Sequence, residues 1–196
     1  MMSHTFELYF NRTTHLVMSN HMCEAILKTC IECGPIALSS PSDYNARAEL
    51  LWASAWAING FLRCGRLGAW SCHPMEHPLS AWYDITHGVG LAILTPRWMR
   101  YILKKDSNTV SAFAAYATNV WEADKALPED ERALLGIQYT EKFFYQTLGL
   151  PSRLSILGID NAHFEAMAAT AVKEGLVNAY VPLNQDDVVQ IYQASL

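Results

Sequence analysis

Three of the seven histidines fall within fifteen residues, at His73, His77 and His87, with Glu76 and Asp84 between them. Neutral imidazole nitrogens bind divalent iron and zinc, usually together with a carboxylate that completes the site. A lone histidine is more often a hydrogen-bonded polar residue than a metal ligand, because imidazole forms hydrogen bonds readily on its own, and the grouping of three makes the two interpretations comparable. The spacing therefore leaves a metal site and ordinary polar packing open, and it names neither a metal nor a reaction.

The elements around these histidines are predicted to be two consecutive helices. Pro74 suits the first turn of a helix, since its missing N–H would have no partner within the helix there. A helix that starts near Pro74 has His73 at its N-terminus and His77 one turn along the same face. A second helical pattern opens at His87, directly before a glycine. Two helix starts that each present an imidazole can converge on one ion.

The rest of the chain is also predicted to be helical, because apolar residues recur mostly at three- and four-residue steps. The expected helices are 14–33, 42–64, two within 72–105 separated by 84–87, 108–123, 129–148, 161–174 and 185–194. Gly34 and Pro35 are expected to stop the first of these helices. Alternating strand patterns, internal repeats and a glycine-rich strand-to-helix turn are absent from the sequence. We therefore predict an all-α bundle over residues 1–196.

Composition and charge narrow the possible partners. The net charge of −5 and the lack of a Lys/Arg stripe argue against nucleic acid. We interpret the one basic cluster as the solvated face of a helix; it consists of Arg97, Arg100, Lys104 and Lys105. The longest apolar stretch, 50–62, is interrupted by Ser54 and Asn59 and is too short to span a bilayer. No secretory leader is visible, so we expect a cytoplasmic protein without a membrane partner.

The five cysteines are predicted to be reduced thiols, because their number is odd and their spacing irregular. Cys30 and Cys33 form a C-x-x-C pair, which is compatible with redox or metal chemistry. No second pair completes a zinc site, so core packing is the favoured interpretation.

The histidine segment resembles the second signature of the iron-containing alcohol dehydrogenases. The matching positions are Trp70–His73, Glu76, His77, Leu79–Ala81, Ile85, His87, Gly88 and Gly90. The resemblance continues at Gly34–Pro35, Ala57–Gly60 and Leu150–Leu154, and so covers essentially the whole chain. Within that family the chain is most similar to the NADPH-dependent butanol dehydrogenase and aldehyde reductase branch. The resemblance implies the helical, metal-binding C-terminal domain of a dehydroquinate synthase-like fold, without the α/β cofactor domain that precedes it.

The resemblance also implies a set of metal ligands. The family holds its metal with one aspartate and three histidines, and the matching histidines here are His4, His73 and His87. The metal is expected to be Fe²⁺, with Zn²⁺ as an alternative, since imidazole binds both. The family's aspartate lies four residues before the first histidine, which here falls before Met1. Water or a nearby carboxylate such as Glu7 can fill that position.

His77 is not a ligand in the family pattern but lies close to the nicotinamide cofactor and the substrate path. The resemblance implies a catalytic role for His77 in relaying a proton to or from the substrate oxygen. The alternative is that His77 only orients His73. Trp82 and Phe61 are candidates for lining the substrate pocket.

The family reaction is hydride transfer between NAD(P)H and an alcohol or aldehyde. We expect the chain alone to be inactive, as a catalytic domain that lacks the hydride donor site. The alternative is a metal-binding or oligomerisation module that works with a separate cofactor domain. A zinc-dependent relative of dehydroquinate synthase or glycerol dehydrogenase is less favoured by the segment around His73. A face that packs on the cofactor domain in the family would be exposed here, so we expect a homo-oligomer.

Overall fold

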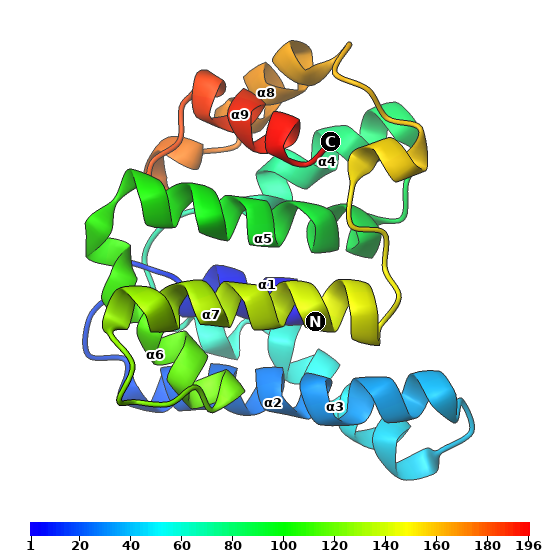
Figure 1. Cartoon of the computed structure of the whole chain (residues 1–196), viewed down its shortest axis with the longest axis vertical. Helices are drawn as coiled ribbons and strands as arrows, with labels where there is room; N and C mark the ends of the chain where they lie inside the picture. The colour runs from blue at the N-terminus through cyan, green and yellow to red at the C-terminus, as the bar shows by residue number, and fades with distance from the viewer. The chain divides into compact units, whose positions relative to one another are not determined.

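Nine α-helices and several short 3-10 or π turns make up the chain, and the computed structural model describes all 196 residues (Figure 1). The only β feature is an isolated parallel bridge between Ala69 and Ala179. The predicted all-α fold is confirmed. The chain divides into two compact units, 1–67 with 110–148, and 68–109 with 149–196. The prediction of a single catalytic domain over 1–196 stays a prediction.

The first unit is built from five α-helices. They are α1 (Met2–Tyr9), α2 (Val17–Ser39), α3 (Tyr44–Ile58), α6 (Val110–Trp121) and α7 (Glu129–Lys142), with 3-10 turn η1 (Phe61–Arg63) after α3 and π turn η3 (Phe143–Thr147) after α7. Helices α2 and α3 form a hairpin, and α6 packs along α7. Gly136 permits this close approach, because a Cβ atom there would lie 2.9 Å from the Cβ of Ala117.

An aromatic cluster forms the core of the first unit. The rings of Phe10 and Phe113 are stacked with centroids 4.4 Å apart. Phe6 meets Tyr116 edge-on at 5.7 Å. Because each ring removes a large apolar area from water, these contacts fix α1 against α6.

The second unit contains the histidine segment. Its helices are α4 (Cys72–Tyr83), α5 (His87–Lys105), α8 (Phe164–Lys173) and α9 (Gln185–Ala194), with 3-10 turns η2 (Ser107–Thr109), η4 (Leu154–Leu157) and η5 (Leu176–Asn178). Helix α4 packs against α5 and α8, and α9 packs against α5 and α8. Asn184 begins α9 with a capping box, in which its side chain accepts from the N–H of Asp187 and Asp187 accepts in return.

Two predicted helix ends in the first unit were wrong. Helix α2 does not stop at Gly34 and Pro35 but continues to Ser39. Gly34 lies within ordinary contact distance of the segment that follows α7, since a Cβ atom there would lie 3.7 Å from Phe143 and 3.8 Å from Leu148. The residues beyond Pro35 are largely exposed, with Ile36 at 46% and Leu38 at 57%, so burial does not explain why the helix continues past the glycine and proline. Helix α3 ends at Ile58 instead of 64, because Gly60 adopts a left-handed φ of 87°.

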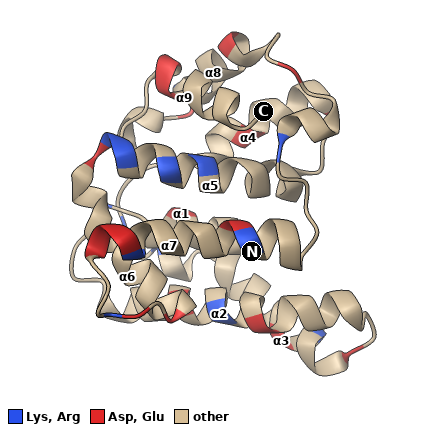
Figure 2. Ribbon diagram, in the orientation of Figure 1, with Lys and Arg blue, Asp and Glu red and all other residues tan.

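The cysteines and the basic cluster differ in part from their interpretations. All five cysteines are free, and Cys30 is buried, but Cys33 is only half-buried, so core packing holds for one member of the pair. Figure 2 shows Lys and Arg positions in blue along α5, and three members of the basic cluster there are exposed: Arg100, Lys104 and Lys105. Arg97 donates to the carbonyl of Ser152 and Lys105 to Asp187. The cluster is therefore not only a solvated face, because two of its members bind within their own unit.

No helix of the structure is both long enough and apolar enough to span a membrane.

Candidate functional site

Helices α4 and α5 bring three imidazoles together in the second unit. His73 and His77 lie one turn apart on α4, and His87 is the first residue of α5. The ring centroids of His73 and His87 are 5.3 Å apart, those of His77 and His87 5.8 Å, and those of His73 and His77 6.1 Å. His73 is buried, whereas the side chains of His77 and His87 are about half exposed. The cluster therefore has a closed inner side and an open outer side.

A buried carboxylate holds His87 in place. Glu76 is 0% exposed, and its Oε2 accepts a hydrogen bond from Nδ1 of His87. Its other oxygen, Oε1, accepts from the hydroxyl of Ser80 at 2.6 Å. Gly90 makes room for this carboxylate, since a Cβ atom at position 90 would lie 2.5 Å from Oε1. The glycine, the glutamate and the histidine thus form one closely packed group.

A second carboxylate contacts His77. Nδ1 of His77 lies 2.9 Å from Oε2 of Glu174, which follows the last residue of α8. Sequence analysis missed this pair, because 97 residues separate the two positions and no local spacing connects them.

A buried tyrosine fixes the inner side of α4. The hydroxyl of Tyr192 on α9 donates to the carbonyl of Met75 at 2.5 Å, and both residues are fully buried. Burial raises the pKa of Tyr192, and the nearby charges of Glu76 and Glu174 raise it further. Tyr192 therefore stays a neutral donor, and it holds α4 between the two histidines that this helix carries.

The donor chemistry of these residues fits a divalent metal. An ionised carboxylate can only accept, so Nδ1 of His87 carries the proton and Nε2 keeps its lone pair. A carboxylate behind a ligating imidazole is the usual arrangement at metal sites. Two imidazoles that share one metal through bonds of about 2.1 Å have ring centroids roughly 5–6 Å apart, which includes the separation of His73 and His87.

The third predicted ligand, His4, lies in α1 of the first unit and is half-buried. Glu7, the candidate substitute carboxylate, is buried in the same helix. No group of three or more His, Cys, Asp or Glu side chains is placed to hold a metal ion. The set of three ligating histidines therefore stays a prediction.

The two aromatic candidates for a substrate pocket lie in different units. Trp82 on α4 is half exposed and stacks on His163 with centroids 4.1 Å apart. Phe61 belongs to the first unit, where it meets Trp56 edge-on at 5.5 Å. Both rings have aromatic partners in their own unit, and their role in a pocket stays a prediction.

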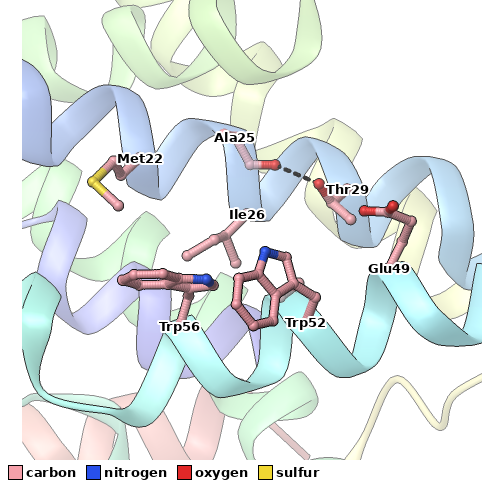
Figure 3. Close-up of a pocket in the computed structure, with 8 residues that line it drawn as sticks. Met22, Ala25, Ile26, Thr29, Glu49, Trp52 and Trp56 are labelled. Atoms are coloured by element: carbon pink, nitrogen blue, oxygen red, sulfur yellow. Dashed lines mark hydrogen bonds between the residues drawn. The ribbon is translucent and has the colours of Figure 1, made fainter.

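A separate apolar pocket lies in the first unit, between α2 and α3. Its volume is about 190 Å³, and Figure 3 shows the rings of Trp52 and Trp56 facing Met22 and Ile26 across it. The polar groups at its far end are Thr29 and Glu49, and Thr29 donates its hydroxyl proton within its own helix. This pocket contains none of the predicted site residues.

Comparison with known proteins decides the family. The model of the Fe-containing alcohol dehydrogenase family, C-terminal, matches residues 1–196. The chain belongs to the iron-containing alcohol dehydrogenase family. Among characterised members, it is 50% identical to NADH-dependent butanol dehydrogenase B of Clostridium acetobutylicum, over 100% of this chain and 50% of that protein. It is 33% identical to the NADPH-dependent aldehyde reductase YqhD of Escherichia coli, over 88% of this chain and 43% of the reductase.

Solved structures of the iron-containing alcohol dehydrogenases agree with this assignment. NADH-dependent butanol dehydrogenase A of Thermotoga maritima superposes with a TM-score of 0.88 and 30% identity, over 99% of this chain and 50% of that one. The substrate- and cofactor-free aldehyde reductase YqhD gives a TM-score of 0.87 at 30% identity, over 100% and 50%. The chain spans about half the length of the relatives it matches, and it corresponds to their helical C-terminal half.

Proposed function

We propose that this chain is the metal-binding part of an oxidoreductase that interconverts alcohols and aldehydes with a nicotinamide cofactor. The observation that carries the proposal is the cluster of His73, His77 and His87, in which two of the three imidazoles have a carboxylate at Nδ1. Family membership supports the reaction class, and the names of the relatives support an alcohol or aldehyde as substrate. The choice between NADH and NADPH is left open, because the named relatives use one or the other.

The residues of the chain take distinct parts in this proposal. His73 and His87 bind a divalent metal, Fe²⁺ by family or Zn²⁺, and Glu76 orients His87 for it. When bound, the metal supplies Lewis-acid polarisation of the substrate oxygen, and the nicotinamide carries the hydride. His77 holds or moves a proton at Nε2, next to the two ligands. The assignment of His4 as a further ligand rests on the sequence resemblance.

Metal titration of the whole chain tests the ligands. We expect the chain to bind Fe²⁺ under anaerobic conditions, or Zn²⁺, in isothermal titration calorimetry. Replacing His73 or His87 by alanine removes a direct ligand, so affinity should fall by more than the roughly 10–100-fold typical of losing a residue behind a ligand.

The matched control is His163→Ala, because His163 lies in the same unit and stacks on Trp82 outside the cluster. This variant should bind metal like the native chain. Equal affinity of the His73, His87 and His163 variants would refute the proposed site.

A second experiment concerns turnover. We expect the 196-residue chain by itself not to reduce aldehydes with NADH or NADPH, because the relatives named for the whole reaction are about twice as long. Oxidation of NADH or NADPH is followed by absorbance with the metal-loaded chain and butyraldehyde. Measurable turnover that depends on His87 would contradict this expectation and would assign the complete activity to this chain.

Self-association is also part of the proposal. Several large apolar side chains are exposed on α3, among them Leu51 at 73% and Trp52 at 63%. Exposed apolar clusters are typical of protein contacts. We therefore infer that the chain forms homo-oligomers. Sedimentation velocity should show a species larger than the 22.0 kDa monomer, and a Leu51→Lys, Trp52→Lys variant should shift it toward the monomer.

A further inference from the structure

Glu174 is the acidic residue that contacts His77, and its position on α8 is electrostatically unfavourable. It is the residue that caps the C-terminus of α8, where the partial negative charge of the helix dipole disfavours a carboxylate. The residue before it, Lys173, carries the positive charge that the dipole favours at the C-terminus of a helix. Pairing with His77 gives the carboxylate a donor that offsets its unfavourable position.

The backbone around Glu174 is fixed relative to α4. Gly175 takes a left-handed φ of 100° and turns the chain into η5, where Leu176 is fully buried. Two residues later, the carbonyl of Asn178 accepts from the N–H of Ala69 at 3.0 Å, in the segment that leads into α4. The carboxylate and the imidazole therefore meet between two anchored backbones, in contrast to a pair of long side chains on a free surface.

The contact determines which nitrogen of His77 carries the proton. A carboxylate only accepts hydrogen bonds, so the atom that faces it, Nδ1, must be N–H. The other nitrogen, Nε2, is then the basic atom of the neutral ring. In alcohol oxidation the hydroxyl proton of the substrate moves to Nε2 and the O–H electron pair stays on oxygen. In aldehyde reduction the same proton returns from Nε2 to oxygen. The oxidation step starts from the tautomer that Glu174 selects, and the reduction step, in which the imidazolium gives up its Nε2 proton, ends on the same tautomer.

We propose that Glu174 is a positioning residue, whose carboxylate holds His77 as the Nδ1–H tautomer with Nε2 ready to exchange a proton with the substrate oxygen. This inference rests on the proposed function for the purpose of the tautomer. The tautomer itself is a property of the metal-free chain and can be measured without any activity.

Long-range ¹H–¹⁵N NMR of the imidazole nitrogens tests the proposal at about pH 8.5, well above the ordinary imidazole pKa of about 6.5. The signals of His77 are identified by their loss in His77→Gln. In the native chain, Nδ1 of His77 should be protonated and Nε2 unprotonated. In Glu174→Ala, His77 should shift to a population in which the Nε2–H form predominates, as in free histidine.

Two further variants separate positioning from general stabilisation. Glu174→Gln should keep the Nδ1–H tautomer, because its amide oxygen still accepts the hydrogen bond. Glu165→Ala on the same helix should leave His77 unchanged, since the Glu165 carboxylate contacts Gln185 at 3.0 Å. An Nε2–H form in the native chain, or an unchanged tautomer in Glu174→Ala, would overturn the proposal even if one variant folds poorly.

The metal titration described above distinguishes this inference from the proposed function. Glu174→Ala should bind metal with native affinity, because His77 is not a ligand. If the chain binds no metal but His77 shows the expected tautomer, the proposed function is refuted and the positioning role of Glu174 remains. Native metal binding with the wrong tautomer would refute only the role of Glu174.

Discussion

Gly90 and Glu76 are in van der Waals contact across the interface of α5 and α4, and a methyl group on residue 90 would stand 2.5 Å from Oε1 and 2.8 Å from Cγ of the glutamate. The atoms concerned are buried and are tied to Ser80 and His87, so they cannot swing away from an added group. The absence of a side chain at position 90 is therefore a requirement of the histidine cluster.

The first prediction follows from this contact. Gly90→Ala should lower the free energy of unfolding by about 1–3 kcal/mol, as overpacked core positions do. It should also weaken metal binding, because Glu76 must move away from His87. Urea unfolding and metal titration measure the two effects.

Gly88→Ala is the matched control, since a Cβ atom there meets nothing within 4 Å and the residue lies in the first turn of the same helix. It should be neutral or stabilise by up to about 1 kcal/mol, because alanine loses less backbone entropy on folding. If both alanine variants behave alike, the contact with Glu76 has no energetic importance.

The second prediction concerns the charge of Glu76. Glutamine has the same shape but offers one accepting oxygen, where the native carboxylate accepts from both Ser80 and His87. In Glu76→Gln the amide nitrogen would face one of these two donors. Either the Ser80 hydroxyl would then rotate away, or His87 would change to its other tautomer. Affinity for Zn²⁺ should therefore fall by about 10–100-fold, as is typical when the partner of a metal-binding histidine is lost.

Titration calorimetry checks this, with Glu165→Gln as the control for removal of one negative charge. Native affinity in Glu76→Gln would show that the carboxylate has only a packing role.

The sequence alone predicted the helices that carry the candidate site to the extent that its signals were local. Histidine spacing placed His73 and His77 on one helix and His87 at the start of the next, and α9 has the predicted bounds of 185 and 194. These features depend on residues within about one turn of each other, where helix periodicity and capping operate.

What the sequence could not predict depends on contacts between distant segments. Glu174 and His77 come together because α8 packs on α4, and no periodic pattern encodes that packing. The role of Gly90 depends likewise on a carboxylate from a different helix.

The third prediction is a pH dependence that comes from Asp187. Burial alone would raise the pKa of this carboxyl, but hydrogen bonds from Lys105 and Tyr101, each 2.6 Å long, outweigh it and lower the pKa below the ordinary 3.8. In this range the unfolded chain binds more protons than the folded chain, so stability rises with pH. The stabilisation from Asp187 is fully present above about pH 5 and is lost as the pH falls through its folded pKa.

Asp187→Asn should therefore lower the free energy of unfolding by about 1.5–3 kcal/mol at pH 7, the range for hydrogen bonds to a charged group. Its stability should also fall less than that of the native chain below pH 4, as urea unfolding at several pH values will show. Asp186→Asn, at an exposed position in the same first turn of α9, should change stability by no more than about 1 kcal/mol. If the stability of Asp187→Asn falls with acid as steeply as that of the native chain, this pH dependence belongs to other carboxylates.

The fourth prediction concerns the effect of Pro35, the proline inside α2, on stability. Pro35 cannot donate a backbone hydrogen bond, and its ring crowds the carbonyl of the preceding turn, so the helix continues here at a cost. Pro35→Ala restores the donor and should raise the free energy of unfolding by about 1–2 kcal/mol, somewhat less than the full penalty of a helical proline because the unfolded chain becomes more flexible. Pro41→Ala, in the turn before α3, lacks the helical benefit and should destabilise by about 0.4–1 kcal/mol. Thermal and urea unfolding measure both variants. A gain of stability in Pro35→Ala together with a loss in Pro41→Ala would show that the helix continues through Pro35 at a cost; a loss of stability in Pro35→Ala would mean that this turn of the helix tolerates the proline without strain.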